Sequence, residues 1–414
     1  MGDDRTVASR KTLTRRTLLR GAAGAGLAGA AIAGAGSPGA RGFGVPAVLA
    51  AAPVKIGLLV SYSKVYGQLG EDITAGMTLY LDGIGWTAGG RRITWIREDE
   101  EIDPQVGVRK TRKLIEADGV DFLTGIVATP TAYAIRDMVH NSKTILVVSN
   151  AGGNLLTRAR RSPYIFRVSF TSWQVSAPFG KWFYDNVART AALTAANYGF
   201  GTESLAAFKE TFIPAGGKVI GEVLPPLNNT DYAPYITQVL KMSPEATYNF
   251  YSGSDAVRFV AQSVQYGLAK ASRTTGAGFM VEQDVLPAEG VNALNIYSPL
   301  HWALKLQNPE NLAFTRAYRT RFKRDASVFA MQGYDAARVI VEGLNRTGGN
   351  TTDKDRLVEA MAAVKFASPR GQFEFDPNTH NVIQNIYVRQ VRQIGSDLAN
   401  VVFVNLGRVT DPGK

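Results

Sequence analysis

The sequence contains no cysteine among its 414 residues and only three histidines. The absence of cysteine excludes disulfides, thiol nucleophiles and cysteine-ligated metals, and it leaves no residue for a lipid anchor. The histidines, His140, His301 and His380, lie far apart in the sequence, whereas metal sites need clustered ligands. We therefore expect no metal, no cofactor and no lipid anchor.

Motifs of the common enzyme classes are also missing. Neither a nucleophile elbow nor a phosphate-binding loop occurs. Residues 24–29 match the glycine pattern of dinucleotide-binding loops, but no strand precedes them. The acidic run at residues 98–101 is more typical of an exposed strand end than of a cation site. These absences favour a binding protein over an enzyme.

The first 52 residues have the composition of an export signal. Residues 1–20 are polar and basic and end in Thr14-Arg15-Arg16-Thr17-Leu18-Leu19-Arg20, after which a charge-free stretch continues to Gly36. Two adjacent arginines followed by two leucines indicate the twin-arginine route. The alternative is a membrane anchor, but this Gly- and Ala-rich stretch is weakly hydrophobic for a spanning helix. We predict cleavage near residues 50–52 and a periplasmic protein.

The remaining chain is long and only moderately basic. Without residues 1–52, it holds 39 basic and 33 acidic residues, a net charge of +6. Its basic runs lack the interleaved aromatic residues of a nucleic-acid surface, so we expect no nucleic-acid partner. A chain of this length exceeds the ~250–300 residues at which a single core stops growing, which predicts two lobes.

Strand and helix patterns alternate through most of the chain. The β-rich run at residues 54–60 is followed by apolar residues at helical spacing between Ile73 and Ile84. Similar pairs continue to residue 149 and start again after residue 185, with strands expected at 278–281 and 292–298. The last third breaks the pattern, with three helices and then short strands. Repeated strand–helix units predict parallel sheets covered by helices on both faces, here in two sets.

Short motifs follow one another in a recognisable order. They are Lys55-Ile56-Gly57, Gly70 and Gly76, Glu98-Asp99, Asp103-Pro104, Asp121-Phe122-Leu123 before Gly125, Ser149-Asn150-Ala151, Asn197-Tyr198-Gly199-Phe200-Gly201 and Tyr334-Asp335-Ala336-Ala337. In this order and spacing the chain resembles the leucine/isoleucine/valine-binding family, the type I periplasmic binding proteins. It departs from the family at Lys64, where glycine is usual, and at Gly153, where amino-acid binders often carry a hydroxyl residue.

The resemblance implies an α/β fold of two doubly wound parallel-sheet lobes joined by a three-strand hinge. Residues 53–171 and 300–385 are then expected in the first lobe, and residues 172–299 and 386–414 in the second. It also implies a monomeric solute-binding protein that serves the permease subunits of an ABC importer. A ligand-sensing receptor component of the same fold is an open alternative.

Ligands of open parallel sheets lie beyond the carboxyl ends of the strands, where helices begin. Applied to this chain, that rule and the resemblance select fourteen candidate ligand-binding residues. They are Tyr66, Gln68, Ala128, Thr129, Ala151, Gly153, Trp173, Tyr198, Tyr251, Ser252, Gly253, Glu282, Gln283 and Trp302.

The resemblance implies that Thr129 and neighbouring N–H groups hold a ligand carboxylate and that Tyr198 closes over the ligand. Thr129 could instead only cap its helix, and Tyr66 and Trp302 could be core residues. The candidate aromatic residues predict a small carboxylate with an aromatic or branched apolar body, preferably an aromatic acid. A branched-chain or other amino acid is the alternative, with Glu282 or Asp284 facing its ammonium group.

Overall fold

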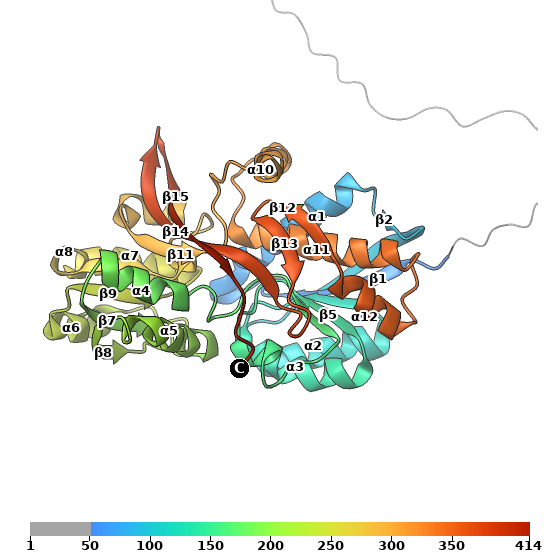
Figure 1. The fold of residues 1–414 in the computed structure, drawn as a ribbon, viewed down its shortest axis with the longest axis horizontal. Coiled ribbons are helices and arrows are strands. Elements are labelled where there is room, and N and C mark those ends of the chain that lie inside the picture. The colour runs from blue at the N-terminus through green and yellow to red at the C-terminus, as the bar shows by residue number, and fades with distance from the viewer. Residues whose placement is uncertain (1–50) are drawn as a thin grey trace, which may run out of the picture. The chain divides into compact units, whose positions relative to one another are not determined.

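Two β-sheets organise the residues that the computed structural model describes, 51–414 (Figure 1). The predicted export signal lies outside the described residues except for Ala51 and Ala52. Within residues 51–414, no helix is both long enough and apolar enough to cross a membrane.

The first sheet has six strands, and all its neighbouring pairs are parallel except β2 with β3. Its order is β2 (Thr87–Ala88), β3 (Arg91–Asp99), β1 (Val54–Val60), β4 (Phe122–Gly125), β5 (Ile145–Val148) and β6 (Ile165–Arg167). Every residue of β4, β5 and β6 is buried. Apart from Thr124 and Arg167, these strands consist of apolar residues and glycine, because helices cover both faces of a parallel sheet.

The second sheet has nine strands and mixes parallel with antiparallel pairs. Its order is β12 (Lys365–Ser368), β13 (Gly371–Phe375), β14 (Val382–Ile394), β11 (Tyr297–Leu300), β10 (Arg273–Gly276), β9 (Ala246–Phe250), β7 (Thr190–Ala195) and β8 (Lys218–Val223), and β15 (Asp397–Val409) pairs with β14. The strands from β11 to β8 are parallel, and β14 runs against β11.

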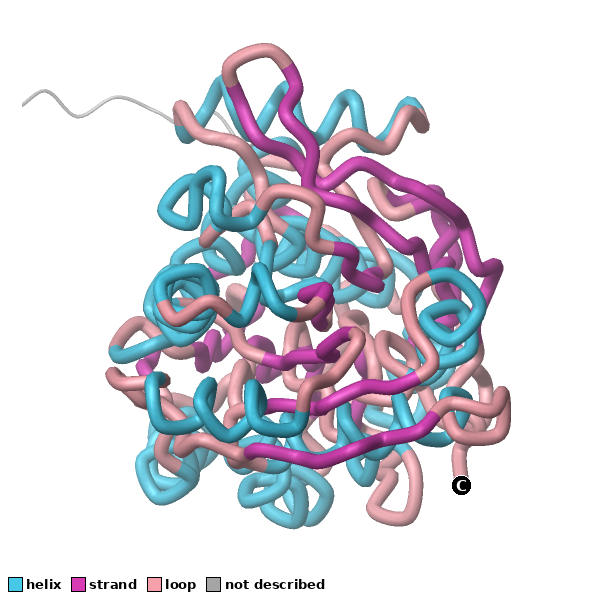
Figure 2. Tube along the Cα trace, turned by 90° about the vertical axis from the view of Figure 1, so that its left-hand side faces the viewer, coloured by secondary structure: helices cyan, strands magenta, loops and turns pink. Residues whose placement is uncertain are grey.

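Helices lie on both sides of the strands, as Figure 2 shows. They are α1 (Gly67–Gly83), α2 (Pro104–Arg112), α3 (Thr129–Ser142), α4 (Ala177–Asn186), α5 (Gly199–Phe212), α6 (Ala233–Met242), α7 (Ser254–Gln265), α8 (Leu268–Ala271), α9 (Leu286–Glu289), α10 (Pro309–Phe322), α11 (Val328–Arg346) and α12 (Lys354–Ala362). The first lobe is the six-stranded sheet with α1–α3, α11 and α12. The second lobe is the parallel part of the second sheet with α4–α9. The predicted two-lobed α/β fold is confirmed.

The chain passes between the lobes after β6, after β11, along β14 and back along β15, which pairs with β14 as far as Val409. After the second passage α11 packs against α1, far away in the sequence. Gly76 and Gly333 permit this contact, because an added Cβ would lie 1.8 Å from Ala330 O and 2.1 Å from Ile73 O, respectively. The residue boundaries of the lobes that the sequence predicts stay a prediction.

Three local predictions differ from the structure. Residues 292–298, expected as a strand, include the end of η5 (Gly290–Ala293) and only the first two residues of β11. Residues 278–281, expected as a strand, form a short 3-10 helix, η4 (Gly278–Val281), and the strand is β10 before it. A run of four buried apolar residues has no periodicity that distinguishes a strand from a helical turn. Helix α4 was not expected, because its Pro, Gly and aromatic residues have low helix propensity. It is stabilised by tertiary packing that buries Phe179 and Phe183.

Candidate ligand-binding site

A narrow cavity lies between the two lobes. The volume of this cavity, called the slot below, is about 290 Å³, including the open space at its mouth. Thirteen residues line it: Tyr66, Leu69, Val127, Thr129, Asn150, Gly152, Phe170, Tyr198, Phe200, Phe250, Ser252, Phe279 and Phe329.

The slot lies where parallel strands end, as the sequence predicts. In the first lobe, Val127 and Thr129 follow β4, and Asn150 follows β5. In the second lobe, Tyr198 follows β7 and Ser252 follows β9. Both lobes thus contribute the carboxyl ends of their strands, where helices present unpaired N–H groups.

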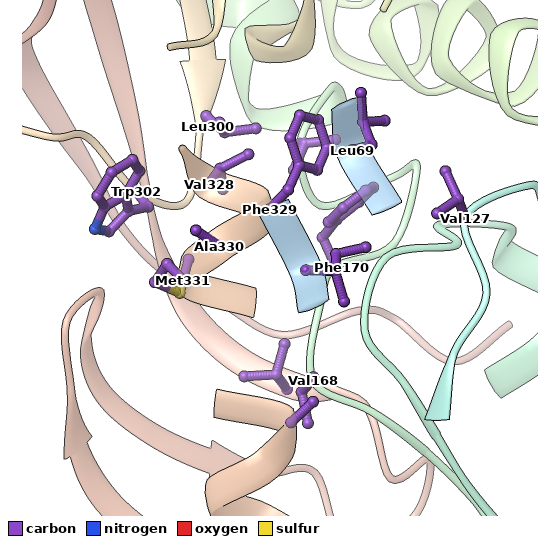
Figure 3. Packing of buried hydrophobic residues seen from close by; sticks show 14 of the residues in the cluster. Leu69, Val127, Val168, Phe170, Leu300, Trp302, Val328, Phe329, Ala330 and Met331 are labelled. Carbon is purple, nitrogen blue, oxygen red and sulfur yellow. The ribbon is translucent and has the colours of Figure 1, made fainter. Parts of the chain in front are cut away.

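Aromatic rings make most of the slot wall. Seven of the lining residues are Phe or Tyr, and several pack ring against ring. The ring centroids of Phe200 and Phe250 are 4.5 Å apart, and those of Phe170 and Phe279 are 4.8 Å apart. Figure 3 shows Phe170, Phe329 and Leu69 close together, with Val127 opposite them. Such a wall suits a flat apolar body, because aromatic rings stack on one another.

The polar groups of the slot are neutral. The Thr129 hydroxyl at the start of α3 is buried and has no hydrogen-bond partner among the described residues. Tyr66 Oη donates to Tyr198 Oη at 2.9 Å, a bond between the first and second lobes. Burial raises the pKa of both phenols, so both stay protonated. Asn150 Nδ2 donates to Gln332 Oε1 at 2.9 Å. Among residues 51–414, those lining the slot include no charged side chain.

A buried carboxylate supports the first-lobe wall from behind. Glu100 Oε1 accepts hydrogen bonds from Ser61 Oγ at 2.8 Å and from the N–H groups of Val127 and Ala128 at 2.8 and 2.9 Å. Burial raises the pKa of Glu100 and these hydrogen bonds lower it, and the net result is a pKa raised to about 6. Glu100 therefore fixes the turn that carries Val127 and Thr129 into the slot.

A buried arginine holds the neighbouring loop. Arg167 Nη1 donates to Gly153 O at 2.6 Å and to Ala151 O at 3.4 Å, and its Nε donates to Asn381 Oδ1 at 2.7 Å. Burial lowers the pKa of Arg167 to about 10, so the group stays charged near neutral pH. Arg167 therefore fixes the loop between β5 and β6, which carries Asn150 and Gly152, by binding two of its backbone carbonyl groups.

Four of the fourteen candidate residues line the slot: Tyr66, Thr129, Tyr198 and Ser252. Six others lie beside lining residues in the chain: Gln68, Ala128, Ala151, Gly153, Tyr251 and Gly253. Among them, Gly253 has φ +58°, and an added Cβ would lie 2.0 Å from Val65 O, so glycine permits the lobes to touch there.

The structure places the side chains of Tyr251 and of the four remaining candidates away from the slot lining. Trp302 is fully buried in the core, and its Nε1 donates to Asn311 Oδ1 at 2.8 Å. The first turn of α11 separates it from the slot residue Phe329 (Figure 3). Tyr251 packs in the second-lobe core, with its ring 4.2 Å from that of Phe259. Large aromatic residues near strand ends can fill either a core or a pocket, and sequence position does not separate the two.

The other three have polar partners of their own. Trp173 Nε1 donates to Glu210 Oε2 at 2.6 Å, and Gln283 Nε2 donates to Leu398 O at 3.4 Å. Glu282 is buried in an ion pair with Arg389, 2.7 Å between Oε2 and Nη1.

Nine lining residues are not among the fourteen candidates, although Asn150 and Gly152 lie in the strand-end loop 150–153 that the sequence places at the site. They are Leu69, Val127, Asn150, Gly152, Phe170, Phe200, Phe250, Phe279 and Phe329. Asn150 and Phe200 stood inside motifs quoted for the resemblance, which was a usable signal. The phenylalanines carry no polar mark that distinguishes them from core residues.

Comparison with known proteins gives the family. Residues 53–397 match the periplasmic binding protein family. The chain belongs to this family. A curated relative, the "Leu/Ile/Val-binding protein homolog 6" of Brucella melitensis, is 29% identical over 355 residues, which cover 84% of this chain and 90% of the relative. This confirms the resemblance to the leucine/isoleucine/valine-binding proteins.

Two solved periplasmic binding proteins carry aromatic acids. A solute-binding protein of an ABC transporter from Rhodopseudomonas palustris BisB5, in complex with 3,4-dihydroxybenzoic acid, is 32% identical with a TM-score of 0.84, covering 87% of this chain and 99% of that chain. Another from R. palustris, in complex with benzoate, is 31% identical with a TM-score of 0.82, covering 87% and 98%. This chain is an ABC transporter substrate-binding protein.

Proposed function

We propose that this periplasmic binding protein captures a small aromatic carboxylate between its lobes and delivers it to an ABC permease. The observation that carries the proposal is a slot lined by seven aromatic rings and no charged side chain among the described residues. A carboxylate can be bound by neutral donors and a helix N-terminus. A ligand ammonium group would be buried without a counter-charge, which is costly.

Three neutral groups support the carboxylate end. The unpartnered Thr129 hydroxyl marks the start of α3, where the helix dipole favours an anion. Tyr198 Oη accepts its bond from Tyr66, so its own proton can be donated to a ligand oxygen. Asn150 contributes an amide at the end of β5. The benzoate and dihydroxybenzoate bound by the two solved relatives are ligands of this kind.

An amino-acid ligand is the second candidate, supported by the name of the Brucella relative. The acidic partners considered for its ammonium group are occupied or buried. The Glu282 carboxylate pairs with Arg389 and accepts the N–H of Val328 at 2.9 Å. Burial raises the pKa of Asp284 well above its ordinary value, which favours a neutral side chain. These features favour the aromatic acid.

A thermal-shift screen of the purified protein tests the proposal. Benzoate, 4-hydroxybenzoate, phenylacetate and cinnamate are compared with leucine, valine and phenylalanine. A ligand at a hundredfold excess over its Kd stabilises a protein by about 2.7 kcal/mol, which gives a visible shift. We expect stabilisation by at least one aromatic acid. Stabilisation by aliphatic amino acids alone would contradict the proposal.

The export route is part of the proposal. Residues 1–52 act as a twin-arginine signal, supported by Arg15-Arg16 and the charge-free stretch behind them. Replacing both arginines with lysine is expected to keep the protein in the cytoplasm. A normal periplasmic yield of that double variant would refute this route and leave the ligand proposal intact.

A further inference from the structure

A second set of contacts joins the lobes outside the slot. Glu203, on α5 of the second lobe, accepts a hydrogen bond from Tyr133 Oη at 2.6 Å through its Oε1. Its Oε2 accepts the backbone N–H of Asn154 at 2.7 Å. Tyr133 lies on α3, and Asn154 begins η3 (Asn154–Thr157) after β5, so both donors belong to the first lobe. Both oxygens of one carboxylate are therefore bound across the cleft.

Gly153, in the loop next to this contact, leaves room for the Tyr133 side chain. An added Cβ at Gly153 would lie 2.4 Å from Tyr133 Oη and 2.5 Å from Thr129 Cγ2. Only glycine lets the Tyr133 hydroxyl extend over the loop toward Glu203. The same hydroxyl also accepts the N–H of Leu155 at 3.2 Å, so Tyr133 connects α3, the loop and the second lobe.

The hydrogen bond between Tyr133 and Glu203 is stronger than one between two neutral groups. Burial and the nearby Glu203 carboxylate raise the pKa of Tyr133, so the phenol stays protonated and acts as the donor. A hydrogen bond from a neutral donor to a carboxylate is about twice as strong as one between neutral groups. The charge of the buried Arg167, which holds Gly153 O, also attracts the Glu203 carboxylate.

We propose that Tyr133 and Glu203 form a clasp that holds the lobes closed and sets the rate at which the ligand leaves. The proposal rests on the proposed function in one respect, namely that the ligand departs only when the lobes separate. The clasp residues do not line the slot. They act as positioning residues, and their loss should speed dissociation far more than it slows association, because the contact exists only once the lobes have met.

The test is a double-mutant cycle with Tyr133→Phe, Glu203→Gln and both together, read by stopped-flow binding of benzoate or 4-hydroxybenzoate. Each single variant should raise the dissociation rate constant about tenfold, the value expected for one charge-assisted hydrogen bond, with the association rate constant within twofold. The double variant should raise the dissociation rate constant by clearly less than the product of the two single effects, because both variants disrupt the Tyr133–Glu203 bond, while Glu203→Gln also weakens the bond from the Asn154 N–H. Glu222→Gln is the matched control, since Glu222 pairs with Lys209 inside the second lobe at 2.6 Å. It should leave both rate constants unchanged.

A second readout separates the clasp from the ligand. The chain has no cysteine, so Glu116→Cys and Lys241→Cys, both exposed, allow one spin label on each lobe. The distance distribution should shift toward the open form in either clasp variant, with and without the acid. If no aromatic acid binds the wild type, the proposed function fails, and the ligand-free distances alone decide on the clasp. Unchanged distances and rate constants in both single variants, or fully additive effects, would overturn it.

Discussion

The ligand slot and the region where the chain crosses between the lobes are built from opposite kinds of residue. The slot is lined by aromatic rings, aliphatic groups and neutral polar groups. The crossing region contains two arginines that are at most 1% exposed, each paired with a buried carboxylate. Arg370 Nη2 lies 2.9 Å from Asp335 Oδ2, and Arg389 Nη1 lies 2.7 Å from Glu282 Oε2.

The difference shows where this fold accepts charge. In the crossing region each of these two buried arginines has a carboxylate and two carbonyl groups as partners. Arg370 Nη1 donates to Val168 O at 2.7 Å, and Arg389 donates to Trp302 O and Gly278 O at 2.8 and 2.9 Å. Pairing of this kind offsets the cost of taking a charge out of water. The described residues that line the slot include no such ion pair, so the carboxylate of the proposed ligand would be the charge inside the slot.

The largest expected effect comes from breaking a buried pair. Arg389→Met leaves Glu282 buried without its counter-charge, and we expect the free energy of unfolding to fall by about 3–5 kcal/mol. Urea denaturation followed by circular dichroism measures it. The double variant Arg389→Met with Glu282→Leu is the control and should recover part of the loss, because it removes the unpaired charge but leaves the Val328 N–H and the Trp302 and Gly278 carbonyls without these partners. A single variant as stable as wild type would show that the pair contributes little.

A smaller effect concerns Glu100, the buried carboxylate behind the slot wall. Its pKa is raised from 4.5 to about 6, so the folded protein binds its proton more tightly than the unfolded chain does. Stability from this group is therefore present below pH 4.5 and is lost as the pH rises through about 6. From pH 4.5 to pH 7, wild type should lose about 2 kcal/mol relative to Glu100→Gln, as measured by denaturation at both pH values. Parallel pH profiles of the two proteins would refute this assignment.

The smallest effect concerns one hydroxyl in the slot. Thr129→Val removes a donor proposed to meet the ligand carboxylate, and we expect the Kd for benzoate to rise about tenfold. The melting temperature should stay the same or rise slightly, because the hydroxyl has no protein partner among the described residues. Thr131→Val is the matched control, since Thr131 is buried on the same helix without lining the slot. Equal losses of affinity in both variants would mean that Thr129 only shapes the helix.

The sequence predicted the fold well because fold signals repeat. Strand–helix alternation occurs along most of the chain, and each unit independently indicates a parallel sheet. Local chemistry also explains a helix start at Asp103, whose side chain accepts the N–H groups of Gln105 and Val106 at the beginning of α2. It failed at residues 278–281 and at α4, where tertiary burial overrides local propensity.

The site was harder to predict for a physical reason. Backbone positions at strand ends follow from topology, and Thr129, Tyr198 and Ser252 were found that way. Which aromatic ring faces a slot and which faces a core depends on long-range packing. Trp302 and Phe329 lie on opposite sides of the same helical turn, and neither sequence neighbourhood distinguishes them (Figure 3).

The most direct test of a slot without charge is calorimetric titration with a matched pair of ligands. Phenylacetate and L-phenylglycine share the ring and the carboxylate and differ only in the α-ammonium group. We expect phenylacetate to bind with at least a hundredfold lower Kd, because an ammonium group in the slot would have no acidic partner. Equal affinity for the two ligands, or tighter binding of phenylglycine, would contradict the account.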